Sequence, residues 1–378
     1  MNLPTLALWY QRNHNHSIKE KSPVIDLHVN LWRRIEESIN YLDIGIKIVE
    51  QRDVGSLNLY VPFSRSNCKV SDLAHLLKKK EISSAVFNEV LEVEPLEGSD
   101  TTFYIRQNDK HFLSIHQIDV ETDIEYIEGI AAEKFDGFVV RLKRDFCSKF
   151  QMPGDHYVRF RFDLNGESAR VFSSNVSNED GWILSSITSS EITEIRVNEV
   201  RSIPEPVQRL SKLEAWLQPT LQTIHYFLVR DIKFDLVASH ASFRKIRRME
   251  PEWDEYVGFP EGSARNMLIY HWRASKDGGG SVGDFVTLAK FRRSKDNVKL
   301  YILLVVALGS IGSGIHSSLS FGTKSAAVWV SGNDGLLSDW PGWEAVAATV
   351  ILLLFFYGIA ARALGWRPWK KKATHLSE

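Results

Sequence analysis

The sequence predicts an α+β module followed by two C-terminal transmembrane helices. Residues 300–319 and 345–361 contain no Asp, Glu, Lys or Arg. A helix of about twenty apolar residues matches the roughly 30 Å hydrocarbon core of a bilayer. The preceding sequence mixes strand-like and helix-like patterns without a strict βαβ order, which is typical of an α+β domain.

This pattern divides the chain into seven parts. They are a polar N-terminal arm at 1–21, a cytosolic α+β module at 22–275, a Gly-rich and then basic juxtamembrane linker at 276–299, a first transmembrane helix at 300–319, an external loop at 320–343, a second transmembrane helix at 344–366, and a basic cytosolic tail at 367–378.

Alternating apolar residues predict the strands of the module. In residues 24–31, apolar side chains alternate with Asp26, His28 and Asn30, which is the period of a half-buried strand. Asn108-Asp109 and Asn165-Gly166 are favourable turn sequences. They predict two hairpins, 103–106 with 112–115 and 157–164 with 168–172. Further strands are expected at 57–61, 226–229, 232–237 and 267–272.

Two helices are expected in the module. Ser71 is a candidate N-cap before Leu73, Leu76 and Leu77, and Pro204 and Pro206 precede a second apolar stripe that begins at residue 207. The basic residues of 244–248 are followed directly by acidic residues of 250–255. This arrangement favours a solvated helix with internal ion pairs, and the alternative is a phosphate-binding patch.

The charges flanking the apolar segments predict the topology. Cations are concentrated before the first segment and after the second, which by the positive-inside rule puts both termini in the cytoplasm of a multi-pass inner-membrane protein. Two buried helices of a protein outside the membrane are the alternative. The basic juxtamembrane residues are Lys290, Arg292, Arg293, Lys295, Lys299, Arg367, Lys370, Lys371 and Lys372.

Small residues in the first apolar segment predict close helix packing. Gly309 and Ser313, and likewise Ser310 and Gly314, form small-xxx-small pairs around Gly312. Such pairs allow two helices to approach closely in lipid. They predict either packing between the two spans of one chain or self-association, with the lipid bilayer as the surrounding partner.

Composition excludes some classes of protein. The formal net charge of −1 argues against a protein that coats nucleic acid. Only Cys68 and Cys147 are present, far apart in sequence, which suits a reducing compartment and matches no zinc-site spacing.

The sequence contains no strong catalytic, metal or cofactor motif. Gly278, Gly280 and Gly283 fit G-x-G-x-x-G, but no strand–helix context surrounds them, so a linker is the better interpretation. We therefore expect no catalytic residue, no metal and no cofactor. A pocket that united Asp155, His156 and His271 would instead favour an enzyme, and dispersion of these residues would count against one.

The layout resembles the two-transmembrane effector proteins of bacterial anti-phage defence, including those that accompany retron reverse transcriptases. The resemblance covers the tail, its orientation and the preceding module, and it includes no diagnostic motif. It implies an effector, not an enzyme, that senses a signal or a protein or ribonucleoprotein partner through residues 22–275 and then permeabilises the inner membrane. A passive membrane-anchored adaptor and a membrane-bound enzyme with an unrecognised active site are the alternatives.

Overall fold

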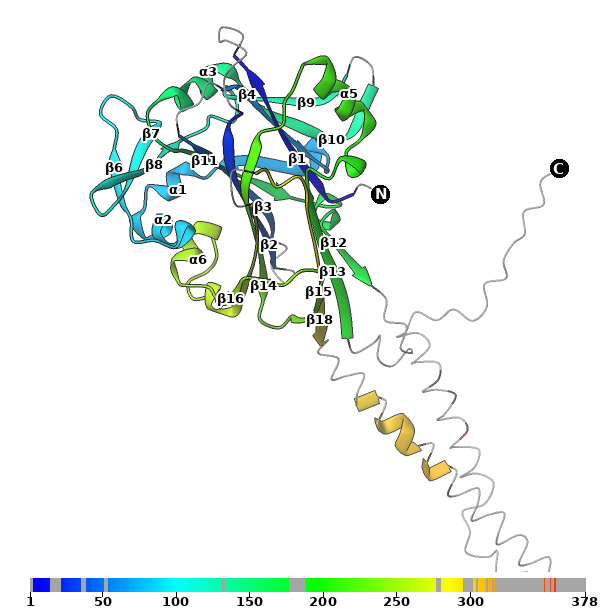
Figure 1. Cartoon of the computed structure of the whole chain (residues 1–378). Coiled ribbons are helices and arrows are strands. Elements are labelled where there is room, and N and C mark those ends of the chain that lie inside the picture. The colour runs from blue at the N-terminus through cyan, green and yellow to red at the C-terminus, as the bar shows by residue number, and fades with distance from the viewer. Residues whose placement is uncertain are drawn as a thin grey trace, which may run out of the picture. The chain divides into compact units, whose positions relative to one another are not determined.

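A computed structural model describes most of the chain up to residue 294. The described residues are 3–13, 22–34, 39–50, 54–130, 133–176, 188–276, 280–294, 302–303, 305–310, 312–314, 316, 350, 354 and 357. The chain divides into two compact units, residues 1–294 and 295–378. The strands and the longer helices described here all belong to the first unit (Figure 1).

One sheet of the first unit has eight strands. They follow the order β15-β18-β13-β1-β4-β10-β9, and β12 pairs with β13 beside this path. The strands are β1 (Thr5–Arg12), β4 (Val54–Val61), β9 (Ile124–Ile130), β10 (Glu133–Leu142), β12 (Ser173–Val176), β13 (Thr188–Val197), β15 (Asp235–Ser239) and β18 (Phe285–Ser294).

The other sheet has ten strands. They follow the order β16-β17-β14-β2-β3-β11-β8-β7-β6, and β5 pairs with β11 beside this path. The strands are β2 (Val24–Arg34), β3 (Ile39–Val49), β5 (Cys68–Asp72), β6 (Glu92–Pro95), β7 (Thr102–Gln107), β8 (Lys110–His116), β11 (His156–Leu164), β14 (Thr220–Asp231), β16 (Lys245–Arg248) and β17 (Met267–Ser275).

The two sheets pack face to face around the main hydrophobic core. This core joins residues such as Leu8 and Leu59 of the eight-stranded sheet to Leu27 and Ile46 of the ten-stranded sheet. Burial of each such side chain contributes about 1.5–3 kcal/mol. The first unit is therefore a β-rich fold of two mixed sheets, and the α+β class expected from the sequence is wrong.

Most of the short helices cover the outer faces of the two sheets, whereas the helix at 144–147 contributes Phe146 and Cys147 to the main core. The helices are α1 (Ala74–Leu77), α2 (Lys80–Phe87), α3 (Arg144–Cys147), α5 (Glu205–Leu213) and α6 (Glu252–Val257). A second cluster packs α1, α2 and α6 on the ten-stranded sheet, and a third packs α5 on the eight-stranded sheet. Figure 1 shows α2 and α6 on one side of this unit and α5 on the other.

Parallel pairing brings distant parts of the sequence together. β1 pairs with β13, and β2 pairs with β14, in parallel, so that His28 lies opposite His225. Most other pairs are antiparallel, and only the antiparallel pairs can be joined by a tight hairpin. The centre of each sheet therefore depends on strands that lie nearly the length of the module apart in sequence.

Several expected elements are present. Strand 24–31 forms β2, and the hairpin at Asn108-Asp109 joins β7 and β8, with both turn residues at positive φ (49° and 61°). The helix after Pro204 is α5, which has Pro206 in its first turn.

Other expectations are wrong because distant partners prevail over local patterns. The expected arm contains β1, which pairs with both β4 and β13. The expected linker contains β18, which pairs with β13 over its whole length. Strand 157–164 pairs with β3, β5 and β8, while Ser168–Arg170 forms a 3₁₀ turn. Ser71 lies in β5, so it is not a helix cap, and within the basic run at 244–248 the residues Lys245–Arg248 form β16, not a helix.

The predicted two-span tail also requires correction. Across the residues that the structure describes, no helix is long and apolar enough to cross a bilayer. An uncharged run is necessary for a span, but it must also form a continuous helix of about twenty residues. The structure therefore does not support the multi-pass inner-membrane topology expected from the sequence. Most of the predicted spans, the loop 320–343 and the tail 367–378 lie outside the described residues.

Candidate functional site

A cleft of about 420 Å³ opens on the outer face of the ten-stranded sheet. Its floor comes from alternate side chains of β2, β14 and β17, because successive strand residues point to opposite faces. Its walls come from the end of α2, from β16 and from Trp253 of α6. The volume lies within the range of small-molecule sites, about 300–1,000 Å³.

The row of polar residues on β2 faces this cleft. Ile25, Leu27 and Val29 point into the core between the sheets, which leaves Asp26, His28 and Asn30 on the opposite face. The alternation that predicted the strand is thus also the reason that these polar side chains lie together. They line the cleft floor beside His225 and Phe227 of β14.

A buried chain of hydrogen bonds leads from Asp43 to the cleft floor. Tyr256 Oη donates to Asp43 Oδ2 at 2.9 Å and accepts from Arg159 Nε at 2.6 Å. Arg159 Nη1 donates to Tyr157 Oη at 2.8 Å, which lies 3.2 Å from His28 Nδ1. Tyr157 Oη accepts from Arg159, and it can donate its own proton to His28 Nδ1 in the tautomer that carries the ring proton on Nε2.

Asp43 anchors this chain. It is fully buried and also accepts two hydrogen bonds from Arg161, at 2.7 and 3.0 Å, and one from Trp32 Nε1 at 2.7 Å. Burial alone would lower the pKa of Arg159, but Tyr157, Tyr256 and Asp43 raise it. The guanidinium of Arg159 therefore stays charged and fixed in place at the inner end of the cleft.

Three buried polar atoms at the cleft have no hydrogen-bond partner. Of the described residues, seven have such an atom, and three of these, Asp26 Oδ1, Asn30 Oδ1 and Arg159 Nη2, belong to residues that line the cleft. Arg159 Nη2 lies 3.9 Å from the nearest Asp43 oxygen, which is too far for a hydrogen bond. Because buried polar groups are nearly always paired, this concentration indicates a binding surface.

The three histidines of the floor are uncharged at neutral pH. His225 Nδ1 and His271 Nε2 are 3.0 Å apart, so one ring donates to the other. Burial, followed by the nearby His271 and Arg273, lowers the pKa of His225 to about 3. Burial, followed by Arg244, lowers the pKa of His271 to about 4. The pKa of His28 is also well below its ordinary value, through burial and then His225.

The rim of the cleft is basic. Lys47 is paired with Asp155 at 2.8 Å, and Arg247 is paired with Glu250. Arg244 and Lys245 are exposed, and neither forms an ion pair with a described residue. These two cations are therefore available to an anionic ligand.

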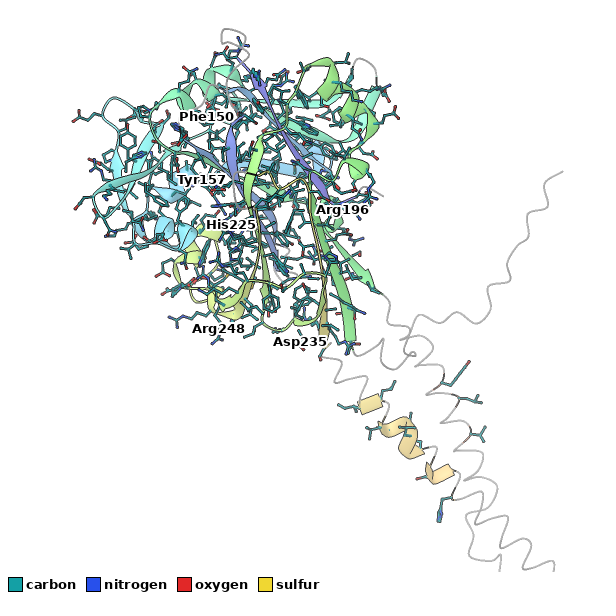
Figure 2. All side chains as sticks on the ribbon, in the orientation of Figure 1. Phe150, Tyr157, Arg196, His225, Asp235 and Arg248 are labelled. Carbon is teal, nitrogen blue, oxygen red and sulfur yellow. The ribbon has the colours of Figure 1, made fainter. Side chains whose placement is uncertain are left out.

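Aromatic rings stand on two sides of His28. On one side, the Phe87 ring is centred 6.4 Å from His28 and 5.8 Å from Phe112. On the other side, the His225 ring is centred 5.0 Å from His28. Phe227 stacks on His271 at 4.3 Å beyond it. Figure 2 labels Tyr157 and His225, which come to this region from β11 and β14.

The residues weighed as a catalytic group are dispersed. His271 lines the cleft, whereas His156 lies in a separate buried chain in which Thr102, His116, His156 and the Met152 carbonyl follow one another at 2.8–3.0 Å. Asp155 pairs with Lys47. Within the described ranges no group of His, Cys, Asp and Glu has the arrangement of a metal site.

The packing residues predicted in the first apolar segment lie in the second unit. Gly309, Ser310, Gly312, Ser313 and Gly314 are helical. A Cβ added at Gly309 or Gly312 would meet no atom within 4 Å. Their role in self-association stays a prediction. Lys290, Arg292 and Arg293 lie on β18, while Lys295, Lys299, Arg367, Lys370, Lys371 and Lys372 lie outside the described residues.

A second cleft of about 440 Å³ is the weaker candidate. Its central Arg141 is already bound to Glu125 and Glu214. None of the unpartnered buried atoms found in the described residues belongs to its lining. The cleft above the ten-stranded sheet therefore has the stronger signature of a site.

Sequence reasoning missed the central residues of this site. His28, Asn30, Arg159 and His225 were not singled out, although three polar side chains alternating along an apolar strand were a usable signal. No protein-family model and no curated protein matches the chain.

Proposed function

We propose that residues 1–294 form a ligand-binding module whose cleft takes a small anionic molecule. The observation that carries this proposal is that three buried polar atoms without a hydrogen-bond partner, on Asp26, Asn30 and Arg159, belong to residues that line one cleft, and that the rim of this cleft carries free cations. The sensing role expected from the sequence becomes, in this proposal, the recognition of a small molecule.

The arrangement supports binding more than catalysis. His225 and His271 are hydrogen-bonded to each other and are uncharged at neutral pH, so neither is a proton donor ready for a substrate. Arg159 is held by Tyr157 and Tyr256, and a fixed donor of this kind favours recognition because little freedom is lost when the ligand binds.

Calorimetric titration of the full chain with inorganic phosphate, pyrophosphate and nucleoside monophosphates tests the proposal. The double substitution Arg244→Glu/Lys245→Glu should weaken binding of any anion that the wild type binds by about tenfold or more, and added salt should weaken wild-type binding. The matched control, Lys69→Glu/Lys212→Glu, makes the same charge change at exposed lysines outside the cleft and should bind normally. Absence of binding to every anion, or equal loss in both double variants, contradicts the proposal.

A further inference from the structure

The polar groups of the cleft differ in kind between its inner end and its rim. Arg159 and Asn30, 1% and 5% exposed, lie at the inner end. Arg244 and Lys245 at the rim are exposed to solvent. A ligand that satisfies both regions must therefore have one end that forms directional hydrogen bonds and another that carries negative charge.

The inner end does not suit a phosphate. Its unpartnered Asn30 Oδ1 is an acceptor and requires an N–H or O–H donor from the ligand. Its unpartnered Arg159 Nη2 is a donor and requires an acceptor. A phosphate has acceptor oxygens but few donors at neutral pH, so it does not satisfy Asn30. The group that fits carries donors and acceptors side by side.

The aromatic side chains select a flat group. Phe87 stands on one side of His28, and His225 with the stacked pair Phe227 and His271 stands on the other. Flat aromatic ligands stack on such rings, and stacking of a base on an aromatic side chain contributes about 1–3 kcal/mol. A nucleobase combines a flat ring with adjacent donors and acceptors on its edges.

We propose that the cleft binds a nucleotide with its base at the inner end, against Asn30 and Arg159, and its phosphate at the rim, against Arg244 and Lys245. This inference rests on the proposed function and names the class of ligand. Hydrogen bonds from the fixed Arg159 select the edge of the base, and the rim cations attract the phosphate without removing it from water.

Calorimetry on the full chain with two sets of probes tests this arrangement. One set is AMP, GMP, CMP and UMP, and the other is ribose 5-phosphate and pyrophosphate, which keep the charge but lack a base. At least one nucleoside monophosphate should bind about tenfold or more tightly than ribose 5-phosphate, since the base adds hydrogen bonds and stacking.

Two variants separate the base end from the phosphate end. Asn30→Leu is nearly isosteric but has no amide, so it should lose about tenfold in nucleotide affinity and keep its affinity for pyrophosphate within about twofold. Phe87→Leu should likewise lower nucleotide affinity. It replaces Asn30→Leu as the test if Asn30→Leu lowers the melting temperature. Arg244→Glu/Lys245→Glu should weaken binding of both probe sets.

The outcomes distinguish the two proposals. If ribose 5-phosphate or pyrophosphate binds as tightly as all four nucleotides, or if Asn30→Leu and Phe87→Leu leave nucleotide affinity unchanged, the nucleotide inference fails while the anion-binding function stands. If no probe binds, both fail. If Arg244→Glu/Lys245→Glu leaves nucleotide affinity unchanged, the assignment of the phosphate to the rim is overturned.

Discussion

Glu191 and Arg230 join the two sheets across their buried interface. Glu191 Oε2 of β13 accepts a hydrogen bond from Arg230 Nη1 of β14 at 3.2 Å, and Arg230 Nη2 lies 3.1 Å from Glu191 Oε1 in the same ion pair. Arg33 of β2 binds the same carboxylate. Arg230 is fully buried between the rings of Phe234 and Phe291. The pair therefore fixes the strands that carry the cleft floor to the opposite sheet.

Substitution of Glu191 by Gln should destabilise the first unit by about 3–5 kcal/mol. The carboxylate neutralises two arginines, and loss of one partner leaves a buried charge uncompensated. Urea unfolding of the full chain, followed by tryptophan fluorescence, measures the change. Glu194→Gln is the control on the same strand, where an ion pair with a partly exposed Arg196 should matter by no more than about 1 kcal/mol. Equal effects of the two substitutions would show that the inter-sheet pair is not important for stability.

Gly45→Ala should destabilise the protein by about 1–3 kcal/mol, because the new methyl group would overlap Tyr157 Oη and crowd Arg159 Nη1. It should also weaken ligand binding, since Tyr157 and Arg159 hold the inner end of the cleft. Thermal unfolding and calorimetric titration measure the two effects. Gly283→Ala is the matched control, because a Cβ there meets no atom within 4 Å.

A double-mutant cycle identifies the overlapping atom. Tyr157→Phe alone removes the hydroxyl that accepts from Arg159 and should lower stability by about 1–3 kcal/mol. In the double variant Gly45→Ala/Tyr157→Phe, the hydroxyl that meets the methyl group is absent, so the combined loss should be smaller than the sum of the single losses. Strict additivity would mean that the methyl group is accommodated in another way.

Stability should fall as the pH is lowered from about 6.5 toward 4.5. His225 has a folded-state pKa of about 3, against about 6.5 when unfolded, so within this interval the unfolded chain binds the extra proton. Acid therefore favours unfolding, by up to about 1.4 kcal/mol per pH unit for this residue. Urea unfolding at several pH values measures the slope, which His225→Asn should reduce.

Asp72 acts in the opposite direction and serves as an internal check. Burial raises the pKa of Asp72 to about 6, despite hydrogen bonds from the backbone of Ile118 and Ala74. Its folded form keeps a proton that the unfolded form releases, so its contribution to stability is lost as the pH rises through 6. Asp72→Asn should therefore steepen the loss of stability on acidification. A pH slope that is the same in wild type, His225→Asn and Asp72→Asn would contradict both assignments.

Local patterns in the sequence predicted individual strands well. The alternation around His28 predicted β2, and Asn108-Asp109 predicted the hairpin of β7 and β8, because each signal depends on neighbouring residues only. The turn sequence Asn165-Gly166 failed for a physical reason. β11 gains three partners elsewhere in the sheet, and these outweigh the hairpin that the turn alone would favour.

The candidate site depends on contacts that no local pattern contains. His28 meets His225 through a parallel pair of strands, and Tyr157 reaches His28 from a third strand. Charge patterning also gave a wrong prediction. The run at 244–248 suggested a helix neutralised by the acidic residues that follow it, but Lys245–Arg248 form an edge strand. Arg247 pairs with Glu250, whereas Arg244 and Lys245 form no ion pair with the described acidic residues. Hydropathy alone predicted two membrane-spanning helices, but no helix among the described residues is long and apolar enough to cross a bilayer.

The parallel pairing of β2 with β14 has a consequence for the newly made chain. During synthesis, Asp26 and His28 emerge early, but the strands that complete the floor beside them are made only when residues 220–275 follow. Contacts of such long sequence separation form slowly. The cleft is therefore absent from any nascent chain that stops short of β17. A ligand would therefore bind at this site only to chains that have been synthesised and folded through β17.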